Sequence, residues 1–235
     1  GNNGDDTIHG GDGFDRLYGG DGADIIHGDD SIDWLYGSWG NDTLTGGLGD
    51  DSLFGESGND SLYGQDGNDL ISGGGGVDMI TGGVGRDTLT GGSGNDLIYG
   101  WTGNDIIFGD YGDDVIYGQA GNDSLYGDDG VDIIFGGSGY DWLYGGAGND
   151  SLKGEDGNDY IYGGDGVDIA HYSGNFNDYS FVEIDSTLKV VDNRVGKYKW
   201  TDALSSIEFI TFADQTVEES KVDVVKTYSG NFSDY

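Results

Sequence analysis

The sequence contains no cysteine and no proline, and only 9 of its 235 residues are lysine or arginine. Without cysteine, the chain can form neither a disulfide framework nor a thiolate metal site. The 45 acidic residues bring the formal net charge to −36, which excludes nucleic acid as a partner because phosphate contacts need cationic side chains. No apolar run approaches the roughly 18 residues of a membrane-spanning helix, and no signal-peptide pattern is present. We therefore expect a chain that does not span a membrane.

Glycine, in contrast, is present in 50 copies, and most of them follow a strict nine-residue period. The unit is G-G-x-G-x-D-x-U-x, where U is Ile or Leu, and nineteen units fill residues 1–171 without an insertion or deletion. Position 1 is always Gly and position 6 is always Asp. Position 2 is Gly in nine units, position 4 is Gly except at Ser31, and position 8 is Ile or Leu except at Ala170. A period this regular indicates a repeat architecture and not a flexible linker.

This nonapeptide resembles the repeat of the RTX, or haemolysin-type calcium-binding, family. The resemblance implies an all-β fold, a right-handed parallel β-roll (β-solenoid) that binds Ca²⁺ between successive turns. It also implies a module of a protein that a Gram-negative-type bacterium exports by type I secretion, such as a toxin or adhesin. Such a module is disordered without calcium, folds when it binds calcium, and acts outside the cell or at its surface.

The residue types within the unit also predict a β-roll. Positions 7–9 predict a three-residue strand whose middle, aliphatic side chain points inward. The six preceding residues form the turn, where Gly at positions 1 and 4 permits positive φ and close approach of another segment. Two units make one coil of 18 residues, so odd units form one parallel sheet and even units form the other. The column that begins at Ile8 then packs against the column that begins at Leu17.

Two columns of aliphatic side chains are a thin core, which cannot offset about 1–2 kcal/mol of backbone entropy per residue. Stacking brings each position 6 Asp beside the Asp one coil away, as for Asp78, Asp96 and Asp114. Carboxylates and turn carbonyls are the oxygen ligands that Ca²⁺ prefers, and the gaps between turns accommodate at most about 17 ions. The predicted metal ligands are Asp6, Asp15, Asp24, Asp33, Asp42, Asp51, Asp60, Asp69, Asp78, Asp87, Asp96, Asp105, Asp114, Asp123, Asp132, Asp141, Asp150, Asp159 and Asp168.

The turn glycines are expected to supply the backbone of these sites. We expect weaker calcium binding or an empty site at the turn of Ser31, where a side chain replaces the hydrogen of glycine. The glycines predicted to supply turn backbone are Gly10, Gly13, Gly19, Gly22, Gly46, Gly49, Gly73, Gly76, Gly91, Gly94, Gly136, Gly139, Gly145 and Gly148.

The period ends at His171, and six of the nine basic residues lie beyond it. Residues 172–227 are predicted to form a β-rich capping segment that covers the open end of the roll, as flanking segments do in the resembled family. Strands are predicted over 179–184, 188–191 and 207–212, with a short helical turn over 202–206. Residues 228–235 repeat the motif of residues 172–179, so a second flanking copy is expected to start there and to be truncated.

Aromatic residues recur at the outward positions 7 and 9, for example Tyr126 and Tyr144. These rings either stack and stabilise the sheet or form an exposed face that binds carbohydrate, a protein partner or a neighbouring domain. The second reading gives the alternative function, an adhesin-type binding module. No H-E-x-x-H or G-x-S-x-G motif is present, so we expect a non-enzymatic segment, with any catalytic domain elsewhere in the parent protein. We also expect this segment to be a monomer.

Overall fold

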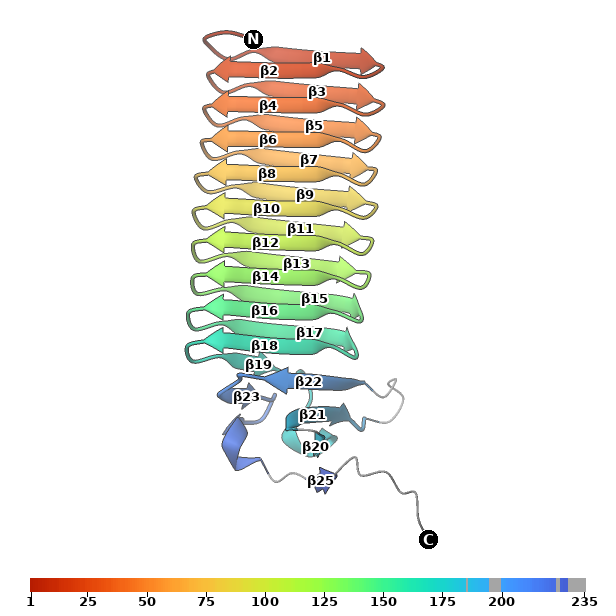
Figure 1. Ribbon diagram of the computed structural model, residues 1–235, viewed down its shortest axis with the longest axis vertical. Coiled ribbons are helices and arrows are strands. Elements are labelled where there is room, and N and C mark those ends of the chain that lie inside the picture. Colours follow the sequence, from red (N-terminus) through yellow and green to blue (C-terminus); the bar gives the residue numbers. More distant parts are fainter. Residues whose placement is uncertain (185, 195–199, 223–224, 228–235) are drawn as a thin grey trace.

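Two long parallel β-sheets face each other in the computed structural model, which describes residues 1–184, 186–194, 200–222 and 225–227. Each nonapeptide unit contributes one strand, and the chain alternates between the sheets (Figure 1). The odd-numbered strands β1 to β19 form one sheet and the even-numbered strands β2 to β18 form the other. The prediction of an all-β parallel β-solenoid with 18 residues per coil is therefore confirmed.

The strands of the roll have six or seven residues, except β19, which has three. Their bounds are β1 Thr7–Asp12, β2 Arg16–Asp21, β3 Ile25–Asp30, β4 Trp34–Trp39, β5 Thr43–Leu48, β6 Ser52–Ser57, β7 Ser61–Asp66, β8 Leu70–Gly75, β9 Met79–Val84, β10 Thr88–Ser93, β11 Leu97–Thr102, β12 Ile106–Tyr111, β13 Val115–Ala120, β14 Ser124–Asp129, β15 Ile133–Gly139, β16 Trp142–Ala147, β17 Ser151–Gly157, β18 Tyr160–Asp165 and β19 Ile169–His171. The cap adds η1 Phe176–Asp178, β20 Tyr179–Ile184, β21 Thr187–Asp192, β22 Thr201–Ser205, β23 Phe209–Thr211, β24 Thr216–Glu218, η2 Glu219–Lys221 and β25 Val225–Thr227.

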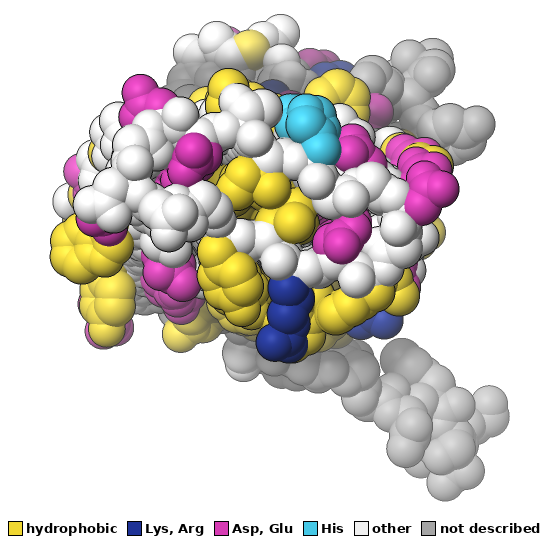
Figure 2. All heavy atoms as spheres, turned by 90° about the horizontal axis from the view of Figure 1, so that it is seen from above, with side chains coloured by type: hydrophobic (Ala, Val, Ile, Leu, Met, Phe, Trp, Pro, Cys, Tyr) yellow, Lys and Arg dark blue, Asp and Glu magenta, His cyan; other side chains and the backbone are white. Residues whose placement is uncertain are grey.

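The predicted core lies between the sheets. Each position 8 side chain pairs with its equivalent one coil away, as Ile98 does with Ile116. These side chains are almost completely buried from Ile26 to Ala170, whereas Ile8 and Leu17 at the N-terminal end are only partly buried. Seen along the roll, hydrophobic side chains lie at the centre, and acidic and further hydrophobic side chains lie around the outer edge (Figure 2).

From β1 to β18 the strands are at least twice as long as predicted, so the expectation of three residues is wrong for these units and holds only for β19. In β11, pairing continues through Trp101 and Thr102, at positions 2 and 3, so the turn occupies only positions 4–6. Position 2 adopts positive φ, 76° at Trp101, and position 1 does not, which corrects the predicted conformation of the position 1 glycine. Stacking on identical coils supplies hydrogen-bond partners on both sides, and this keeps positions 2 and 3 extended despite the unusual φ.

The cap continues the two sheets of the roll. Strand β22 pairs in parallel with β18, and β23 pairs in parallel with β19 (Figure 1). Leu204 and Ile210 are both buried at the ends of the two core columns. The helical turn predicted over 202–206 is wrong, because pairing with β18 and burial of Leu204 override the local signal for a helix start.

The rest of the cap is an antiparallel extension in which β21 lies between β20 and β22. The predicted strands over 179–184 and 188–191 correspond to β20 and β21, whereas the strand predicted over 207–212 is reduced to β23. Strand β25 pairs with β20. The proposed second flanking copy, residues 228–235, lies outside the described residues.

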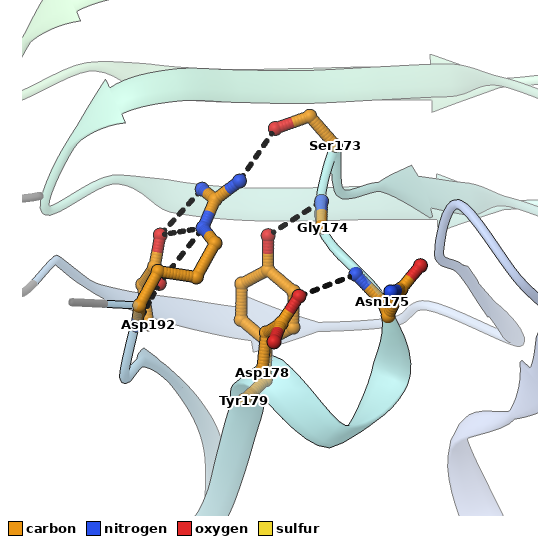
Figure 3. A network of polar contacts seen from close by, with 7 residues as sticks. Ser173, Gly174, Asn175, Asp178, Tyr179 and Asp192 are labelled. Carbon is orange, nitrogen blue, oxygen red and sulfur yellow. Dashed lines mark hydrogen bonds and ion pairs between the residues drawn. The ribbon is translucent and has the colours of Figure 1, made fainter.

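A polar network fixes the start of the cap (Figure 3). The Asp192 carboxylate accepts hydrogen bonds from the Arg194 guanidinium, which also donates to Ser173 Oγ at 3.2 Å. The Tyr179 hydroxyl accepts from the Gly174 amide at 3.0 Å. Packed rings of Tyr172, Tyr179, Phe176, Phe181 and Phe212 lie in the same region. The cap therefore has a conventional aromatic core of its own beside the thin core of the roll.

Candidate calcium sites

The position 6 aspartates form two continuous ladders, one for the turns of each parity. The backbone amide of each Asp donates to Oδ1 of the Asp one coil later, for example from Asp78 to Asp96 at 2.8 Å and from Asp96 to Asp114 at 2.7 Å. The ladders run from Asp6 and Asp15 to the end of the repeats. The structure thus brings together the carboxylates that the period predicted to be neighbours.

The second oxygen of these carboxylates has a different environment. From Asp15 to Asp168, the Oδ2 atoms of eighteen position 6 aspartates are buried and have no hydrogen-bond partner. From Asp24 onward, the position 6 residues are at most 2% exposed. A buried carboxylate oxygen without a partner is costly, and such atoms are rare in folded proteins. Their regular repetition points to a ligand that the fold is built to hold.

The glycine at position 1 leaves room beside each of these oxygens. A Cβ atom on Gly136 would lie 2.6 Å from Asp141 Oδ2 and 2.8 Å from the carbonyl oxygen of Gly154, one coil later. A side chain at position 1 would therefore fill the space into which a carboxylate and a carbonyl both project. This space explains why position 1 is glycine in every unit.

The glycine at position 4 has another role. Gly94 adopts φ 131°, and a Cβ atom there would overlap the carbonyl oxygen of Gly76 in the preceding coil. Positive φ and close stacking of turns both require glycine at this position.

Burial and mutual repulsion raise the pKa of many of these carboxyl groups. Burial raises the pKa of Asp96 to about 7, the Asp78 amide opposes this shift, and the neighbouring charges of Asp78 and Asp114 reinforce it. Asp60, Asp69, Asp87, Asp123, Asp132, Asp141 and Asp159 also have a pKa raised to about 7, chiefly by burial. A cation between the coils would favour the charged form and relieve this repulsion.

The donor set fits a hard cation. Within the part of the chain that the structure describes, no three Asp, Glu or His side chains converge on one point, so side chains alone cannot complete a site. Paired aspartates supplemented by turn carbonyls give an all-oxygen set, which suits Ca²⁺ with its six to eight ligands. Zinc and copper prefer the nitrogen and sulfur ligands that are missing from these turns.

Comparison with protein families agrees with this geometry. The sequence model of the RTX calcium-binding nonapeptide repeat matches residues 1–35, 18–53, 36–71, 45–80, 81–110, 108–143 and 141–170. The chain belongs to this family. A search of curated proteins finds no match. Among the described residues, no helix has the length and apolar character needed to cross a bilayer.

One RTX unit departs from the pattern at Ser31. This residue retains the positive φ of the glycine it replaces, 89°, and its amide donates to the Leu48 carbonyl at 2.6 Å. The amide of Asp33 still donates to Asp51 Oδ1 at 2.8 Å. The substitution therefore leaves the ladder intact, and weaker calcium binding at this turn stays a prediction.

Two acidic residues beyond the RTX repeats were missed by the sequence reasoning. The Asp159 amide donates to Asp202 Oδ1 at 3.0 Å, and the Asp168 amide donates to Glu208 Oε2 at 2.8 Å. Both acidic residues thus take the place that a position 6 Asp would hold one coil later. The available signal was the pattern acidic-x-aliphatic-x, in D-A-L-S (202–205) and E-F-I-T (208–211), which repeats positions 6–9 without their glycines.

The aromatic columns on the outside of the RTX roll are stacked. The rings of Tyr99, Tyr117 and Phe135 follow one another with centroids 4.9 and 4.8 Å apart, and Tyr126 stacks on Tyr144 at 4.8 Å. The rings therefore contact each other along the roll, as the stabilising interpretation requires.

Proposed function

We propose that residues 1–171 are a calcium-dependent folding module of a secreted bacterial protein and that residues 172–227 cap it. The series of buried Oδ2 atoms without partners carries this proposal. Because the aliphatic core is thin, the cost of burying these carboxylates prevents folding until a cation binds them. Folding and calcium binding are then one equilibrium.

Each ion lies between two turns of the same parity and binds the position 6 carboxylates and turn carbonyls of both. Asp96 shares one ion with Asp78 in the turn below and another with Asp114 in the turn above. At most about 17 ions fit in the repeats, and their charge offsets that of the acidic block. The position 1 glycines leave room for the ion in these turns. The position 4 glycines allow the turns to stack closely.

Folding that depends on calcium is compatible with export of the chain in an unfolded form. In a calcium-poor cytoplasm, an unfolded acidic chain remains in a form that a type I secretion channel can thread. Millimolar calcium outside the cell then folds the monomeric module, which remains secreted or at the cell surface. We propose no catalytic role for this segment. Any catalytic activity of the parent protein belongs to another domain.

Circular dichroism of the full chain tests the switch. In excess EDTA the spectrum is expected to be that of a disordered chain, and millimolar Ca²⁺ is expected to produce a strong β signal in one cooperative transition. An equal β signal in both conditions would rule out the proposed coupling.

A second candidate function rests on one aromatic cluster. Trp142 is 52% exposed, and its ring is tilted against Tyr144 and Tyr160 with centroids 6.3 and 5.3 Å apart. This uneven face on the even-numbered sheet favours an adhesin-type module that binds carbohydrate or a protein partner. Glycan binding that is lost in Tyr126→Ala and Tyr144→Ala variants would support it, and retention of binding in both would argue against it.

A further inference from the structure

The cap contains two more units in the register of the roll, although neither has the repeat sequence. In the first, Asp202 takes position 6, and Leu204 pairs with Ile161 at position 8. In the second, Glu208 takes position 6, and Ile210 pairs with Ala170 at position 8. The pattern of hydrogen bonds and core columns therefore extends one full coil beyond the nonapeptides.

The turn that ends in Glu208 is shorter than a turn of the repeats. Ser205 pairs with Tyr162, and only Ser206 and Ile207 separate Ser205 from Glu208, whereas five residues, 163–167, separate Tyr162 from Asp168. Glutamate has one more methylene group than aspartate, and its Oε2 accepts from the Asp168 amide at 2.8 Å. The longer side chain thus compensates for the shorter turn and restores the ladder.

This junction also reproduces the space beside the second carboxylate oxygen. Asp168 is fully buried, and its Oδ2 has no hydrogen-bond partner. A Cβ atom on Gly163 would overlap both Asp168 Oδ2 and the carbonyl oxygen of Ser206. In the coil below, the same space lies between Asp150 Oδ2 and the carbonyl oxygen of Gly163. The Ser206 carbonyl therefore replaces the glycine carbonyl of a repeat turn.

The surface beside this junction is acidic. Glu208, Glu218 and Glu219 line one open depression together with Val167 and Ile207. The charge of Glu208 acts on both Asp168 and Glu219. A divalent cation at the junction would offset this concentration of negative charge.

We propose that Asp168, Glu208 and the Ser206 carbonyl bind a Ca²⁺ ion that fastens the cap to the roll. This site lies outside the nonapeptide motif, and it rests on the proposed function of the repeat aspartates. Because Glu208 is exposed, water completes the coordination and the site fills at a higher calcium concentration than the enclosed sites of the roll.

Counting calcium ions in the folded full-length chain tests the site. Native mass spectrometry at saturating calcium is expected to show about one ion fewer in Glu208→Gln than in the unchanged chain. Glu208→Asp is expected to lose the same ion because its side chain is too short for this turn. Glu56→Gln removes an equal charge from an exposed side chain in β6 and should leave the count unchanged.

Asp96→Asn separates this proposal from the one on which it depends. If Asp96→Asn lowers the ion count and Glu208→Gln does not, the junction site is wrong and the repeat sites stand. If neither variant lowers the count, the proposed function itself is wrong.

The unchanged chain provides a test that does not depend on folding of the variants. Crystals of the full chain grown with Tb³⁺, a probe for calcium sites, are expected to show an anomalous peak between Asp168, Glu208 and the Ser206 carbonyl. Peaks between the repeat turns with none at this junction would overturn the proposal.

Discussion

The backbone amide of Asp96 donates a hydrogen bond to Oδ1 of Asp114 at 2.7 Å, and both residues are buried. From Asp24 to Asp168, one oxygen of each repeat carboxylate therefore accepts a hydrogen bond from the coil before it, while the other has no hydrogen-bond partner within the protein. The two roles differ in what they require of the side chain. An amide oxygen can accept the hydrogen bond, but only a carboxylate provides the negative charge for a cation.

Asp96→Asn is accordingly expected to retain the ladder and weaken calcium binding. Loss of one charged ligand should reduce the free energy of calcium-induced folding by about 1–3 kcal/mol. The calcium midpoint measured by circular dichroism should rise. Asp113→Asn is the matched control, because Asp113 is exposed and its Oδ1 accepts a hydrogen bond that asparagine can also accept. Equal midpoints for the two variants would show that the charge of Asp96 has no special role.

The position 1 glycine offers a test that leaves every carboxylate in place. Gly136→Ala would bring a methyl group within 2.6 Å of Asp141 Oδ2 and 2.8 Å of the Gly154 carbonyl. We expect a raised calcium midpoint and fewer bound ions by native mass spectrometry. In Gly75→Ala, the nearest contact of the new methyl group is Ser93 Oγ at 3.4 Å, so this control should bind calcium normally. Normal ion binding by Gly136→Ala would contradict the assigned position of the ion.

Much of this arrangement is predictable from the sequence, because one period fixes both the core and the aspartate ladder. The six-residue length of the strands could not be predicted from the sequence. Residues such as Gly92 and Ser93 have little intrinsic strand preference and are held in an extended conformation by pairing with the coils above and below. Asp202 and Glu208 were missed for a related reason. The chain between β19 and β22 is much longer than a turn of the repeats, and the next turn is shorter, so spacing along the sequence no longer identifies the neighbour in space.

The raised pKa values predict that acid stabilises the calcium-free roll. The pKa of Asp96 rises from 3.8 to about 7 on folding, so the folded chain binds more protons than the unfolded chain between these values. The stability of the calcium-free roll therefore falls as pH increases through this range and is lowest above pH 7. Calcium-free samples should show more β signal at pH 5 than at pH 8, while calcium affinity should be lower at pH 5 because protons compete for the carboxylates. A calcium-free β signal that increases with pH would oppose this interpretation.

The coil formed by the cap predicts that a single core residue outside the repeats influences folding of the whole roll. Leu204 is 1% exposed and pairs with Ile161, so Leu204→Ala leaves a cavity at the end of one core column. Such a truncation typically costs about 2–5 kcal/mol. Because each coil is stabilised by its neighbours, the loss should raise the calcium midpoint and reduce the cooperativity of folding. Leu48→Ala, at a side chain that is 52% exposed, should change neither. If the two variants have the same calcium titration, closure of the core by β22 does not contribute to folding of the repeats.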